Sequence, residues 1–419
     1  MDKLEVFGAR KLNGIVHISG SKNAALPILA ATILSKKKIV LKNLPNLKDT
    51  ETIIKLLESI GSIVKYSKNQ NSIIIHNKYK LKTFASYNLL KTMRGSFLVL
   101  GSMLARYGNA KVSTPGGCSI GVRPIDIHLK ALAKLGVSYK IIDGYVHAYS
   151  KKKLKGTKIK FPKISVGATE NLIIASSMAE GTTLLSNCAI EPEIKDLINF
   201  INCMGGKIKW IGKRTLKIIG VNDFKEAEYK IMPDRIEAGT YLIAAAVTEG
   251  NLKISGINPK IIKTEIDILR KIGMRIKTKK ELIIISGNNE VRNINLKTAP
   301  YPGFPTDLQA QLMVLLCKSK KHSVIREEIF ENRFLHAAEL NRMGAKIITK
   351  GNKAFIEGNT KFKGAELMAT DLRASVSLIL AALTAKGKTT INRIYHLDRG
   401  YEKLEKKLRK VGAKIRRVS

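Results

Sequence analysis

The sequence predicts an α/β protein with two domains, each made of three copies of one βαβαββ-type unit. The first observation is a glycine that follows an amphipathic helical stretch six times, at intervals of 75, 69, 68, 71 and 68 residues. The second is a more apolar stretch within each unit, rich in alanine and leucine. The third is the length of 419 residues, because one hydrophobic core rarely serves more than about 250 to 300 residues.

Each repeated glycine is expected to end a helix and to precede a strand. A glycine just after the last apolar turn suits the left-handed C-cap of a helix, and the alternating residues that follow are typical of a strand. The period is longer than that of the common solenoid repeats, so each unit should hold two helices and several strands. The six glycines are Gly61, Gly136, Gly205, Gly273, Gly344 and Gly412.

The apolar stretches are predicted to form helices inside each domain, because they lack a polar face. The amphipathic helices before the glycines are expected outside. A short strand should follow each apolar helix, as in KKIVLKNL, TTLLSNC, NLKISGI and KTTINRI. Each unit therefore runs strand, apolar helix, strand, amphipathic helix, strand, strand. The apolar stretches occupy 24–35, 94–108, 169–181, 237–250, 307–320 and 373–387.

The six units are expected to divide three and three between the domains. Residues 21–230 would form the domain that holds the first three units, and 231–419 the domain that holds the last three. Residues 1–20 contain two strand patterns with no helix before them. We expect both strands to complete the last unit, so that 1–20 belongs with the C-terminal domain.

The formal net charge of +41 is open to two interpretations. Clustered lysine and arginine could neutralise nucleic-acid phosphates, which would suit a basic, non-enzymatic RNA-binding repeat protein. The lysines are, however, spread through all six units, and an aromatic content of 6% offers no obvious platform for stacking bases. A solvated lysine surface is therefore the favoured interpretation, and no nucleic-acid partner is predicted.

Hydropathy and cysteine spacing favour a cytoplasmic protein without a metal site. No apolar run reaches the roughly 18 residues of a membrane span, and MDKLEVFGAR lacks the pattern of a signal peptide. The cysteines form no CxxC pair and the seven histidines are scattered, which argues against disulfides and metal sites. Cys188, Cys203 and Cys317 lie in or beside apolar segments and are expected to be buried thiols.

Cations stand at the predicted starts of four apolar helices. These are Lys22, Arg94, Arg235 and Arg373. A cation at this position opposes the helix dipole, so it needs an anionic ligand or a carboxylate partner. The alternative is pairing with a neighbouring acid, as Asp234 could pair with Arg235 and Asp371 with Arg373. Lys22 has no adjacent acid.

The loops that leave the middle strands of three units carry arginines at matching places. The loops are 115–126, 327–333 and 396–400, and the arginines are Arg123, Arg333 and Arg399. If these loops and the helix starts converge, they form a strongly cationic site. Such a site suits a small polyanion that bears phosphate and carboxylate groups, which guanidinium binds through two hydrogen bonds.

Cys118 and Asp307 are the candidates for proton transfer at that site. Cys118 follows a Pro-Gly-Gly stretch and precedes Arg123 by five residues, and a nearby cation favours the reactive thiolate. The alternative is a buried, inert thiol. Asp307 stands at a predicted helix start after Pro-Gly-Phe-Pro-Thr, where it could act as a base or merely interact with the helix dipole.

Nine segments together closely resemble the family of UDP-N-acetylglucosamine enolpyruvyl transferases. The similarity is collinear and runs from end to end of the chain. The segments are SGSKNAALPILAA, KTMRGSFLVLG, PGGCSIGVRPIDIH, FPKISVGATENLI, PDRIEAGTYL, FPTDLQAQ, IFENRFLHAAEL, MATDLRASVSLIL and RIYHLDRGYEKLEKKL.

The resemblance implies a fold and a reaction. The family fold is an inside-out α/β barrel in each of two domains, with three βαβαββ-type units apiece around buried helices. The family transfers the enolpyruvyl (carboxyvinyl) group of phosphoenolpyruvate to the 3-hydroxyl of UDP-N-acetylglucosamine (UDP-GlcNAc) and releases phosphate, by addition and elimination. The reaction opens peptidoglycan precursor synthesis and needs no metal or organic cofactor. A shikimate-type enolpyruvyl transferase, with a small cyclohexene carboxylate as acceptor, is the alternative within the fold.

The resemblance also implies roles for individual residues. Cys118 would protonate the methylene carbon of phosphoenolpyruvate or carry a covalent adduct, and Asp307 would take the hydroxyl proton. A cysteine at 118, where some relatives carry aspartate, implies inactivation by epoxide analogues such as fosfomycin. The expected phosphoenolpyruvate-binding residues are Lys22, Arg123 and Arg399 at the phosphate, Arg333 and Arg373 at the carboxylate, and Asn23, which should also touch the sugar. Lys22 and Arg399 are expected to be catalytic as well. The expected UDP-GlcNAc-binding residues are Asn23, Arg94, Arg123, Pro124, Ile125, Asp126, Ile127, Lys163, Ile164, Ser165, Val166, Asp307 and Ile329.

Overall fold

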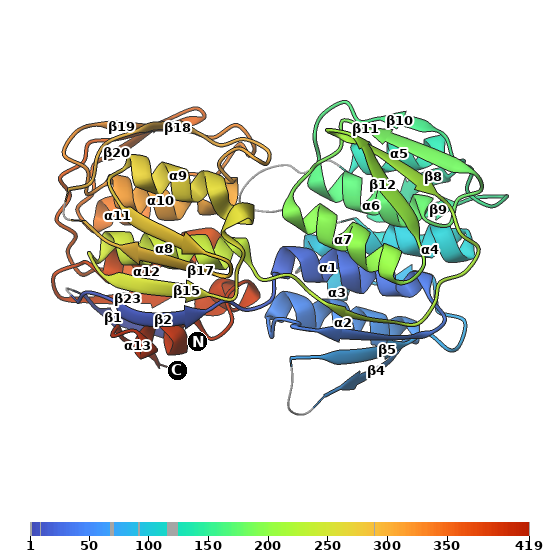
Figure 1. The fold of residues 1–419 in the computed structure, drawn as a ribbon, viewed down its shortest axis with the longest axis horizontal. Helices are drawn as coiled ribbons and strands as arrows, with labels where there is room; N and C mark the ends of the chain where they lie inside the picture. Colours follow the sequence, from blue (N-terminus) through green and yellow to red (C-terminus); the bar gives the residue numbers. More distant parts are fainter. Residues whose placement is uncertain are drawn as a thin grey trace. The chain divides into compact units, whose positions relative to one another are not determined.

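The computed structural model describes residues 2–8, 10–67, 71–90, 93–114, 125–288 and 290–418 (Figure 1). These residues form two compact units. The middle unit comprises 20–114 and 125–232, and the terminal unit comprises 2–19 and 233–418. The chain leaves the middle unit between Met232 and Pro233, two residues beyond the boundary predicted from the sequence.

The middle unit has inner and outer helices and three four-stranded sheets among its described residues. The inner helices are α1 (Lys22–Ala31), α4 (Val99–Tyr107) and α6 (Val166–Ser176), and the outer helices are α2 (Lys48–Ile60), α5 (Asp126–Lys134) and α7 (Pro192–Cys203). The strand order of the first sheet is β14 (Ala227–Lys230), β3 (Lys38–Lys42), β5 (Ile73–His76) and β4 (Ile63–Tyr66). The second sheet is ordered β6 (Phe84–Ala85), β7 (Asn109–Ser113), β9 (Tyr145–Tyr149) and β8 (Ser138–Ile142). The third sheet is ordered β10 (Lys158–Lys160), β11 (Thr182–Ser186), β13 (Thr215–Ile219) and β12 (Lys207–Gly212). Short helical turns add η1 (Thr32–Leu34), α3 (Tyr87–Leu90) and η2 (Arg94–Leu98).

The terminal unit repeats the same arrangement. Its inner helices are α8 (Arg235–Val247), α10 (Gln309–Leu316) and α12 (Leu372–Ala382), and its outer helices are α9 (Lys263–Lys271), α11 (His336–Arg342) and α13 (Leu404–Lys410). The strand order of the fourth sheet is β2 (Asn13–His17), β15 (Asn251–Ser255), β17 (Leu282–Ser286) and β16 (Arg275–Lys279). The fifth sheet is ordered β18 (Asn295–Lys297), β19 (Ser323–Arg326), β21 (Lys353–Ile356) and β20 (Ile347–Lys350). The last sheet is ordered β22 (Glu366–Met368), β23 (Lys388–Asn392), β1 (Lys3–Phe7) and β24 (Lys414–Val418). The 3-10 turns are η3 (Pro259–Ile262), η4 (Thr306–Leu308) and η5 (Ile394–Arg399).

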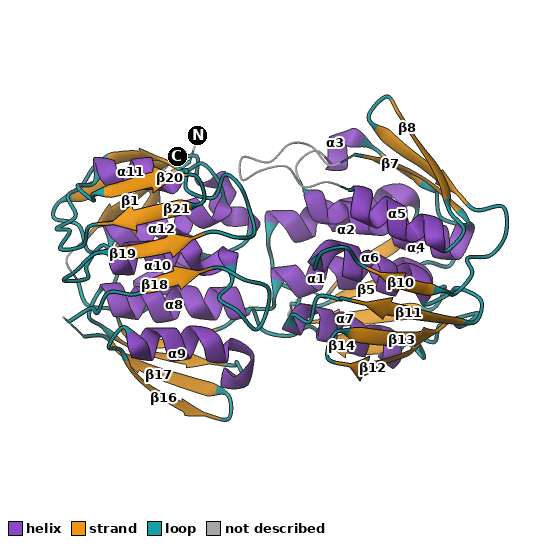
Figure 2. Cartoon of the chain, turned by 90° about the horizontal axis from the view of Figure 1, so that it is seen from above, coloured by secondary structure: helices purple, strands orange, loops and turns teal. Residues whose placement is uncertain are grey.

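The apolar helices lie inside each unit, as the sequence predicts. Every residue of α8 and of α10 is buried, and Figure 2 shows the inner helices lying between the strands. The apolar side chains of these helices and of the inward-facing strand positions form one hydrophobic core in each unit. No helix in the described part of the chain is both long enough and apolar enough to cross a membrane.

All six sheets share one pairing pattern. An edge strand pairs parallel with the strand that follows the inner helix, and the two remaining strands pair antiparallel. The terminal unit follows the same rule. Among the described residues the sheets remain separate and do not join into a closed barrel. Six sheets with one topology confirm the predicted sixfold repeat.

The six repeated glycines all have a left-handed backbone. Their φ angles lie between 97° at Gly136 and 113° at Gly273. This region is strained for residues that carry a Cβ, so glycine is the residue that ends these helices without strain. At the first repeat the N–H of Gly61 donates to the carbonyl of Glu58 at 2.9 Å, and β4 begins two residues later.

The prediction for the N-terminal strands is half wrong. β1 enters the last sheet between β23 and β24, as expected. β2 instead pairs parallel with β15 in the sheet of the fourth unit, from Asn13 opposite Asn251 to His17 opposite Ser255. β14 fills the same edge position beside β3 in the first sheet. The pattern of alternating residues identifies a strand, but the parallel rule of the repeat decides which sheet it joins.

A buried carboxylate fixes the point where the chain leaves the middle unit. Asp196 of α7 accepts a hydrogen bond from the N–H of Met232 at 3.1 Å and from the hydroxyl of Tyr229 at 2.7 Å. Burial raises the pKa of Asp196 to about 6, against the lowering effect of these two bonds. The carbonyl of Met232 accepts in turn from the N–H of Ser21 at 2.8 Å. The entering and leaving segments are therefore hydrogen-bonded to each other inside this unit.

The terminal unit uses a charged partner for the equivalent task. Glu237 of α8 accepts the N–H of Ser19 at 2.8 Å, and Lys407 donates to its other carboxylate oxygen at 2.6 Å. The N–H of Asp234 donates to the carbonyl of Ser19 at 2.9 Å. Burial raises the pKa of Glu237, and Lys407 opposes this shift. Here too the two chain segments meet within one unit.

Candidate functional site

Asp307 is the centre of an ion-pair cluster in the terminal unit. Its Oδ1 accepts from Nη2 of Arg333 at 2.9 Å, and its Oδ2 accepts from Nη2 of Arg373 at 2.8 Å. The two guanidinium side chains are only 5% and 4% exposed, whereas the Asp307 side chain is 26% exposed. The structure therefore brings together the predicted base and the two cations predicted to bind a carboxylate.

Each member of this cluster comes from a different repeat element. Asp307 lies in η4, which leads into α10, and Arg373 is the second residue of α12. Arg333 lies in the loop between β19 and α11, with its guanidinium 5.5 Å from the ring centre of Phe330. Although burial acts to lower the pKa of Arg373, Asp307 and Tyr401 raise it above its ordinary value. The arginine is thus held fully charged.

Neutral side chains that the sequence did not single out complete the cluster. The Tyr401 hydroxyl lies 3.2 Å from Nη1 of Arg373, 2.9 Å from the Thr240 hydroxyl and 3.2 Å from the Gln311 amide nitrogen. Gln311 also donates to the carbonyl of Asp307 at 3.0 Å. Tyr401, Thr240 and Gln311 lie in three separate segments of the sequence, so their mutual contacts follow only from the way these segments pack.

The acids next to Arg373 and Arg235 act as helix caps. The Asp371 carboxylate accepts from the N–H groups of Arg373 and Ala374, at 2.8 and 3.1 Å. Asp234 likewise caps α8, and Arg235 forms an ion pair with Glu265 at 3.4 Å. The ion pairs that the structure shows for the two arginines are with acids far away in the sequence, Glu265 for Arg235 and Asp307 for Arg373.

Histidine and arginine side chains adjoin the cluster. His336 of α11 is fully buried, and burial lowers its pKa to about 4, with a further lowering from Arg333 and an opposing effect from Asp371. It is therefore neutral at pH 7. Arg399 ends η5 and is half-buried. Its neighbour Asp398 accepts from both Nη groups of Arg417, at 2.9 and 2.6 Å.

Lys22 forms the corresponding feature of the middle unit. It is the first residue of α1 and pairs with Asp49 of α2 at 3.4 Å, and the two side chains are 12% and 6% exposed. The Ser21 hydroxyl caps the same helix by accepting the N–H of Ala24 at 3.3 Å. Asn23 is half-buried beside Lys22. The acid that Lys22 lacks in sequence is thus supplied from 27 residues away.

Seven of the predicted nucleotide-sugar residues lie at two adjacent helix starts of the middle unit. α5 packs against α6, and Nδ1 of His128 lies 3.1 Å from the Asn171 amide nitrogen. A Cβ at Gly167 would approach the His128 ring to 3.3 Å, so the two first turns are close together. The residues that the structure describes here are Ile125, Asp126 and Ile127 at α5 and Lys163, Ile164, Ser165 and Val166 at α6.

Four predicted site residues have no described side chain. Cys118, Arg123 and Pro124 lie outside the described residues. Arg94 is the first residue of η2, but its side chain is likewise outside the description. Ile329, in the loop after β19, is described and half-buried, and it lies four residues before Arg333.

The prediction of buried thiols holds for two of three cysteines. Cys188 and Cys317 are fully buried, and burial raises the pKa of each to about 12. Cys203 is exposed. It is the last residue of the amphipathic α7 and falls on its solvent face, so the expectation of burial is wrong there.

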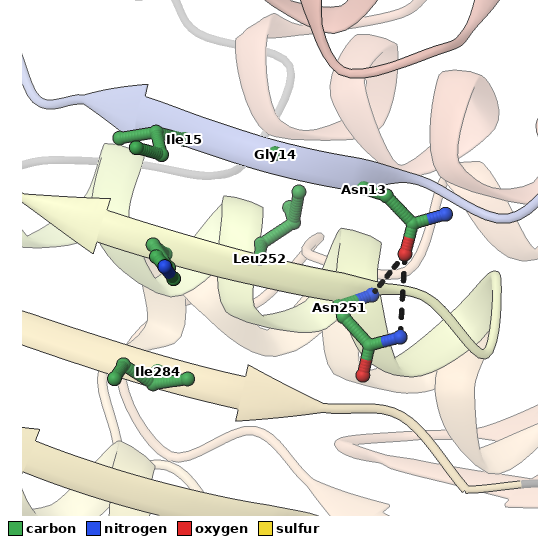
Figure 3. Close-up of a pocket in the computed structure, with 7 residues that line it drawn as sticks. Asn13, Gly14, Ile15, Asn251, Leu252 and Ile284 are labelled. Atoms are coloured by element: carbon green, nitrogen blue, oxygen red, sulfur yellow. Dashed lines mark hydrogen bonds between the residues drawn. The ribbon is translucent and has the colours of Figure 1, made fainter.

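A shallow pocket on the terminal unit is separate from these clusters. It lies over β2, β15 and β17, and its wall includes Ile15, Leu252 and Ile284 (Figure 3). The Oδ1 of Asn13 accepts from the backbone N–H and the side-chain amide of Asn251 at 3.1 and 3.2 Å. A mostly apolar wall lacks the paired guanidiniums that bind a small polyanion, so this pocket is not the candidate site.

Comparison with known proteins identifies the family. A family model described as EPSP synthase (3-phosphoshikimate 1-carboxyvinyltransferase) matches residues 6–408. The chain is 69% identical over 419 residues to the UDP-N-acetylglucosamine 1-carboxyvinyltransferase of Pelagibacter ubique (strain HTCC1062), with 100% of both chains covered. It is 50% identical over 418 residues to the enzyme of that name from Geobacter metallireducens (strain ATCC 53774 / DSM 7210 / GS-15), again with 100% of both covered.

Solved structures share the fold. The enolpyruvyl transferase NikO from Streptomyces tendae matches with a TM-score of 0.91 at 24% identity, over 100% of this chain and 99% of the other. An EPSP synthase from Acinetobacter baumannii matches with a TM-score of 0.78 at 17% identity, over 100% of both chains. The chain therefore belongs to the EPSP synthase family of enolpyruvyl transferases, and within it to the UDP-N-acetylglucosamine 1-carboxyvinyltransferases.

Proposed function

We propose that this protein transfers the enolpyruvyl group of phosphoenolpyruvate to the 3-hydroxyl of UDP-GlcNAc and releases phosphate, the first committed step of peptidoglycan precursor synthesis. The observation that carries the proposal is the full-length identity of 69% to a relative of that name. The cluster around Asp307 supports it, because it places two buried guanidiniums beside a carboxylate at the start of an inner helix.

Arg333 and Arg373 form the proposed carboxylate site. In this structure the pair already holds a carboxylate, that of Asp307, through one hydrogen bond from each guanidinium. Charge-assisted bonds of this kind are about twice as strong as neutral ones. The same two guanidinium groups could donate hydrogen bonds to the carboxylate of phosphoenolpyruvate, provided that at least one of them turns from Asp307 to the substrate.

Lys22, Arg123 and Arg399 form the proposed phosphate site, with Asn23 beside Lys22. Lys22 supports this role because it stands at the N-terminus of α1, where free N–H groups and the helix dipole also favour an anion. The proposed UDP-GlcNAc site uses the first turns of α5 and α6, together with Arg94, Arg123, Pro124, Asp307 and Ile329.

The proposed reaction adds and then eliminates. In the addition, the Cys118 thiol gives a proton to C3 of phosphoenolpyruvate, the 3-hydroxyl oxygen bonds to C2, and Asp307 takes the hydroxyl proton. In the elimination, the C2–O bond to phosphate breaks, phosphate leaves with the bonding electrons, and C3 gives a proton back to the Cys118 thiolate, which forms the vinyl ether and restores the thiol. Each general acid or base step contributes a factor of about 10² to 10⁴. Cationic side chains stabilise the substrate's phosphate and carboxylate throughout.

Asp307 must change partners to act as a base. A carboxylate with a guanidinium on each oxygen is a poor proton acceptor, because both cations favour its charged form. When the carboxylate of phosphoenolpyruvate draws one guanidinium away, the freed oxygen can face the acceptor hydroxyl. Binding of the donor substrate would thereby prepare the base for the acceptor.

A phosphate-release assay tests the proposed function. Phosphoenolpyruvate is incubated with UDP-GlcNAc and, separately, with shikimate 3-phosphate. Phosphate release is expected in the reaction with UDP-GlcNAc and not in the reaction with shikimate 3-phosphate. The opposite result would contradict the proposal.

A second experiment uses Cys118→Asp, which should retain turnover and lose covalent inactivation by fosfomycin. An unchanged rate of inactivation would contradict the role of Cys118.

The domain assignment, location and assembly are part of the same proposal. We assign the Cys118 loop to the domain of 21–230, and we assign 1–20 to the domain of 231–419. We also propose that the protein acts in the cytoplasm as a monomer, without a cofactor. Sedimentation of the purified protein tests whether it is a monomer, since a dimer would have twice the chain mass of 46.3 kDa.

A further inference from the structure

Glu327 is a buried acid that stands close to the proposed base without belonging to the ion-pair cluster. It follows the last residue of β19 and is only 2% exposed. Its carboxylate accepts four hydrogen bonds, from two threonine hydroxyls and two backbone N–H groups. The donors are Thr298 at 2.8 Å, Thr306 at 2.9 Å, Ile329 N–H at 2.9 Å and Phe330 N–H at 3.2 Å.

The two carboxylate oxygens of Glu327 serve different segments. Oε2 accepts from Thr306, the residue before Asp307 and the first residue of η4. Oε1 accepts from Ile329 and Phe330, whose loop continues to Arg333. One rigid carboxylate therefore spans the turn that carries the proposed base and the loop that carries the proposed acceptor contact.

All four partners of Glu327 are uncharged donors. A buried carboxylate is costly to keep without a cation, and hydrogen bonds to it are worth about 1.5 to 3 kcal/mol each. An apolar residue could fill the same space without that cost. The arrangement is therefore better suited to fixing the relative position of two segments than to stabilising the fold.

We propose that Glu327 is a positioning residue, which couples the placement of Asp307 to the placement of the Ile329 loop. The inference rests on the proposed function, because it takes Asp307 as the base and Ile329 as a contact to UDP-GlcNAc. The coupling has two separable arms. The hydrogen bond from Thr306 to Oε2 (the Thr306 arm) would fix the position of Asp307. The hydrogen bonds from the N–H groups of Ile329 and Phe330 to Oε1 (the second arm) would fix the position of the loop that contacts the acceptor.

The chain offers matched variants for the two arms. Thr306→Val removes the hydroxyl that ties η4 to Oε2 and keeps the side-chain shape. Thr298→Val removes the hydroxyl that donates to Oε1 of Glu327. The same hydroxyl accepts the N–H of Glu328 at 2.9 Å, so the variant also loses the hydrogen bond at the start of the loop. Neither threonine is part of the proposed catalytic or binding residues.

Steady-state kinetics of the full-length variants separate the arms. Thr306→Val should lower kcat about 10-fold and change KM for UDP-GlcNAc less than about 2-fold, because a displaced base slows proton transfer without altering acceptor contacts. Thr298→Val should raise KM for UDP-GlcNAc about 5-fold and retain kcat. Glu327→Gln should show both effects. Equal kcat for the two threonine variants, or a Thr306→Val enzyme with wild-type kcat, would overturn the proposal.

Amide hydrogen exchange gives a readout that does not depend on turnover. In Thr306→Val the N–H groups of Leu308 and Gln309 should exchange faster, since they form the hydrogen bonds of the η4 turn. In Thr298→Val they should exchange at the wild-type rate. The same rates in both variants would overturn the positioning role. A wild-type protein that releases no phosphate would contradict the proposed function instead, and the exchange rates would still decide the role of Glu327.

Discussion

The two units carry opposite versions of a charged helix start. In the terminal unit one acid, Asp307, is shared by two arginines, whereas in the middle unit one cation, Lys22, is paired with one acid, Asp49. The named groups of the first cluster carry a net charge of +1, and those of the second carry none. The terminal cluster is also braced by neutral partners around Tyr401. Of the two groups of side chains named here, the one in the terminal unit therefore carries the greater positive charge.

The largest effect is expected from Asp307→Asn, which removes the proposed base and keeps its shape. We expect kcat to fall by about 10² to 10⁴, because an amide cannot take the hydroxyl proton. Steady-state phosphate release measures the fall. Asp49→Asn is the control in the other unit, since it removes a more deeply buried ion-paired acid that has no proposed role in proton transfer. Equal losses of kcat in both variants would remove the distinction between the two units.

The next effect tests whether the cation or its partner matters in the middle unit. Lys22→Met should lower kcat/KM for phosphoenolpyruvate about 100-fold, because a charged hydrogen bond to phosphate is lost. Asp49→Asn should lower it less than about 10-fold, since Lys22 keeps its charge and only its orientation is loosened. A full titration of the initial rate against phosphoenolpyruvate gives both values. If the two variants behave alike, Asp49 itself takes part in the site.

A smaller effect is expected from Tyr401→Phe, which breaks the hydrogen bonds that support Arg373 in the terminal unit. The variant loses the hydroxyl that bonds Arg373, Thr240 and Gln311. A lost hydrogen bond to a charged group corresponds to about 1.5 to 3 kcal/mol, so KM for phosphoenolpyruvate should rise at least several-fold. Tyr229→Phe is the control, because it breaks a buried tyrosine–aspartate bond away from the cluster. A wild-type KM in Tyr401→Phe would show that the arginine needs no bracing.

The smallest effect concerns the stability that Asp196 contributes where the chain leaves the middle unit. The folded protein raises the pKa of Asp196 to about 6 from 3.8, so it binds this proton more tightly than the unfolded chain does. Stability from this group is therefore greatest at low pH and falls as pH rises from about 4 to about 6. Between pH 5 and 7 the free energy of unfolding should fall by about 1 kcal/mol more in the wild type than in Asp196→Asn. Urea unfolding at the two pH values measures this, and parallel curves for both proteins would contradict it.

The sequence specified the repeat far better than the contacts of the site. A capping glycine and an apolar helix are local patterns, and all six of each lie where they were expected. The partner of Lys22 lies 27 residues away, and Arg373 pairs with an acid 66 residues away and not with its neighbour Asp371. Such pairs depend on how the inner helices pack. A nearby acid is therefore weak evidence for an ion pair.

Edge strands show the same limit within the fold itself. β2 has the alternating pattern of any half-exposed strand, and nothing in its residues states that β15 is its partner. The assignment follows only from the shared topology of all six sheets. Glu327 and Tyr401 were missed for a related reason, because their roles come from hydrogen bonds to segments far away along the chain.

The hydrogen bonds at the two crossings make the middle unit a module inserted into the terminal one. In the middle unit Ser21 bonds Met232, and in the terminal unit Ser19 bonds Asp234, so each unit brings its own cut ends together. A Cβ at Gly20 would lie 1.8 Å from the carbonyl oxygen of Asn43, so the entry point tolerates no side chain. A gene fragment for 20–232 would encode one uninterrupted polypeptide, and a short linker from 19 to 233 would close the remainder. The crossings at 19/20 and 232/233 are thus the two positions at which a gene would be cut to express each unit separately.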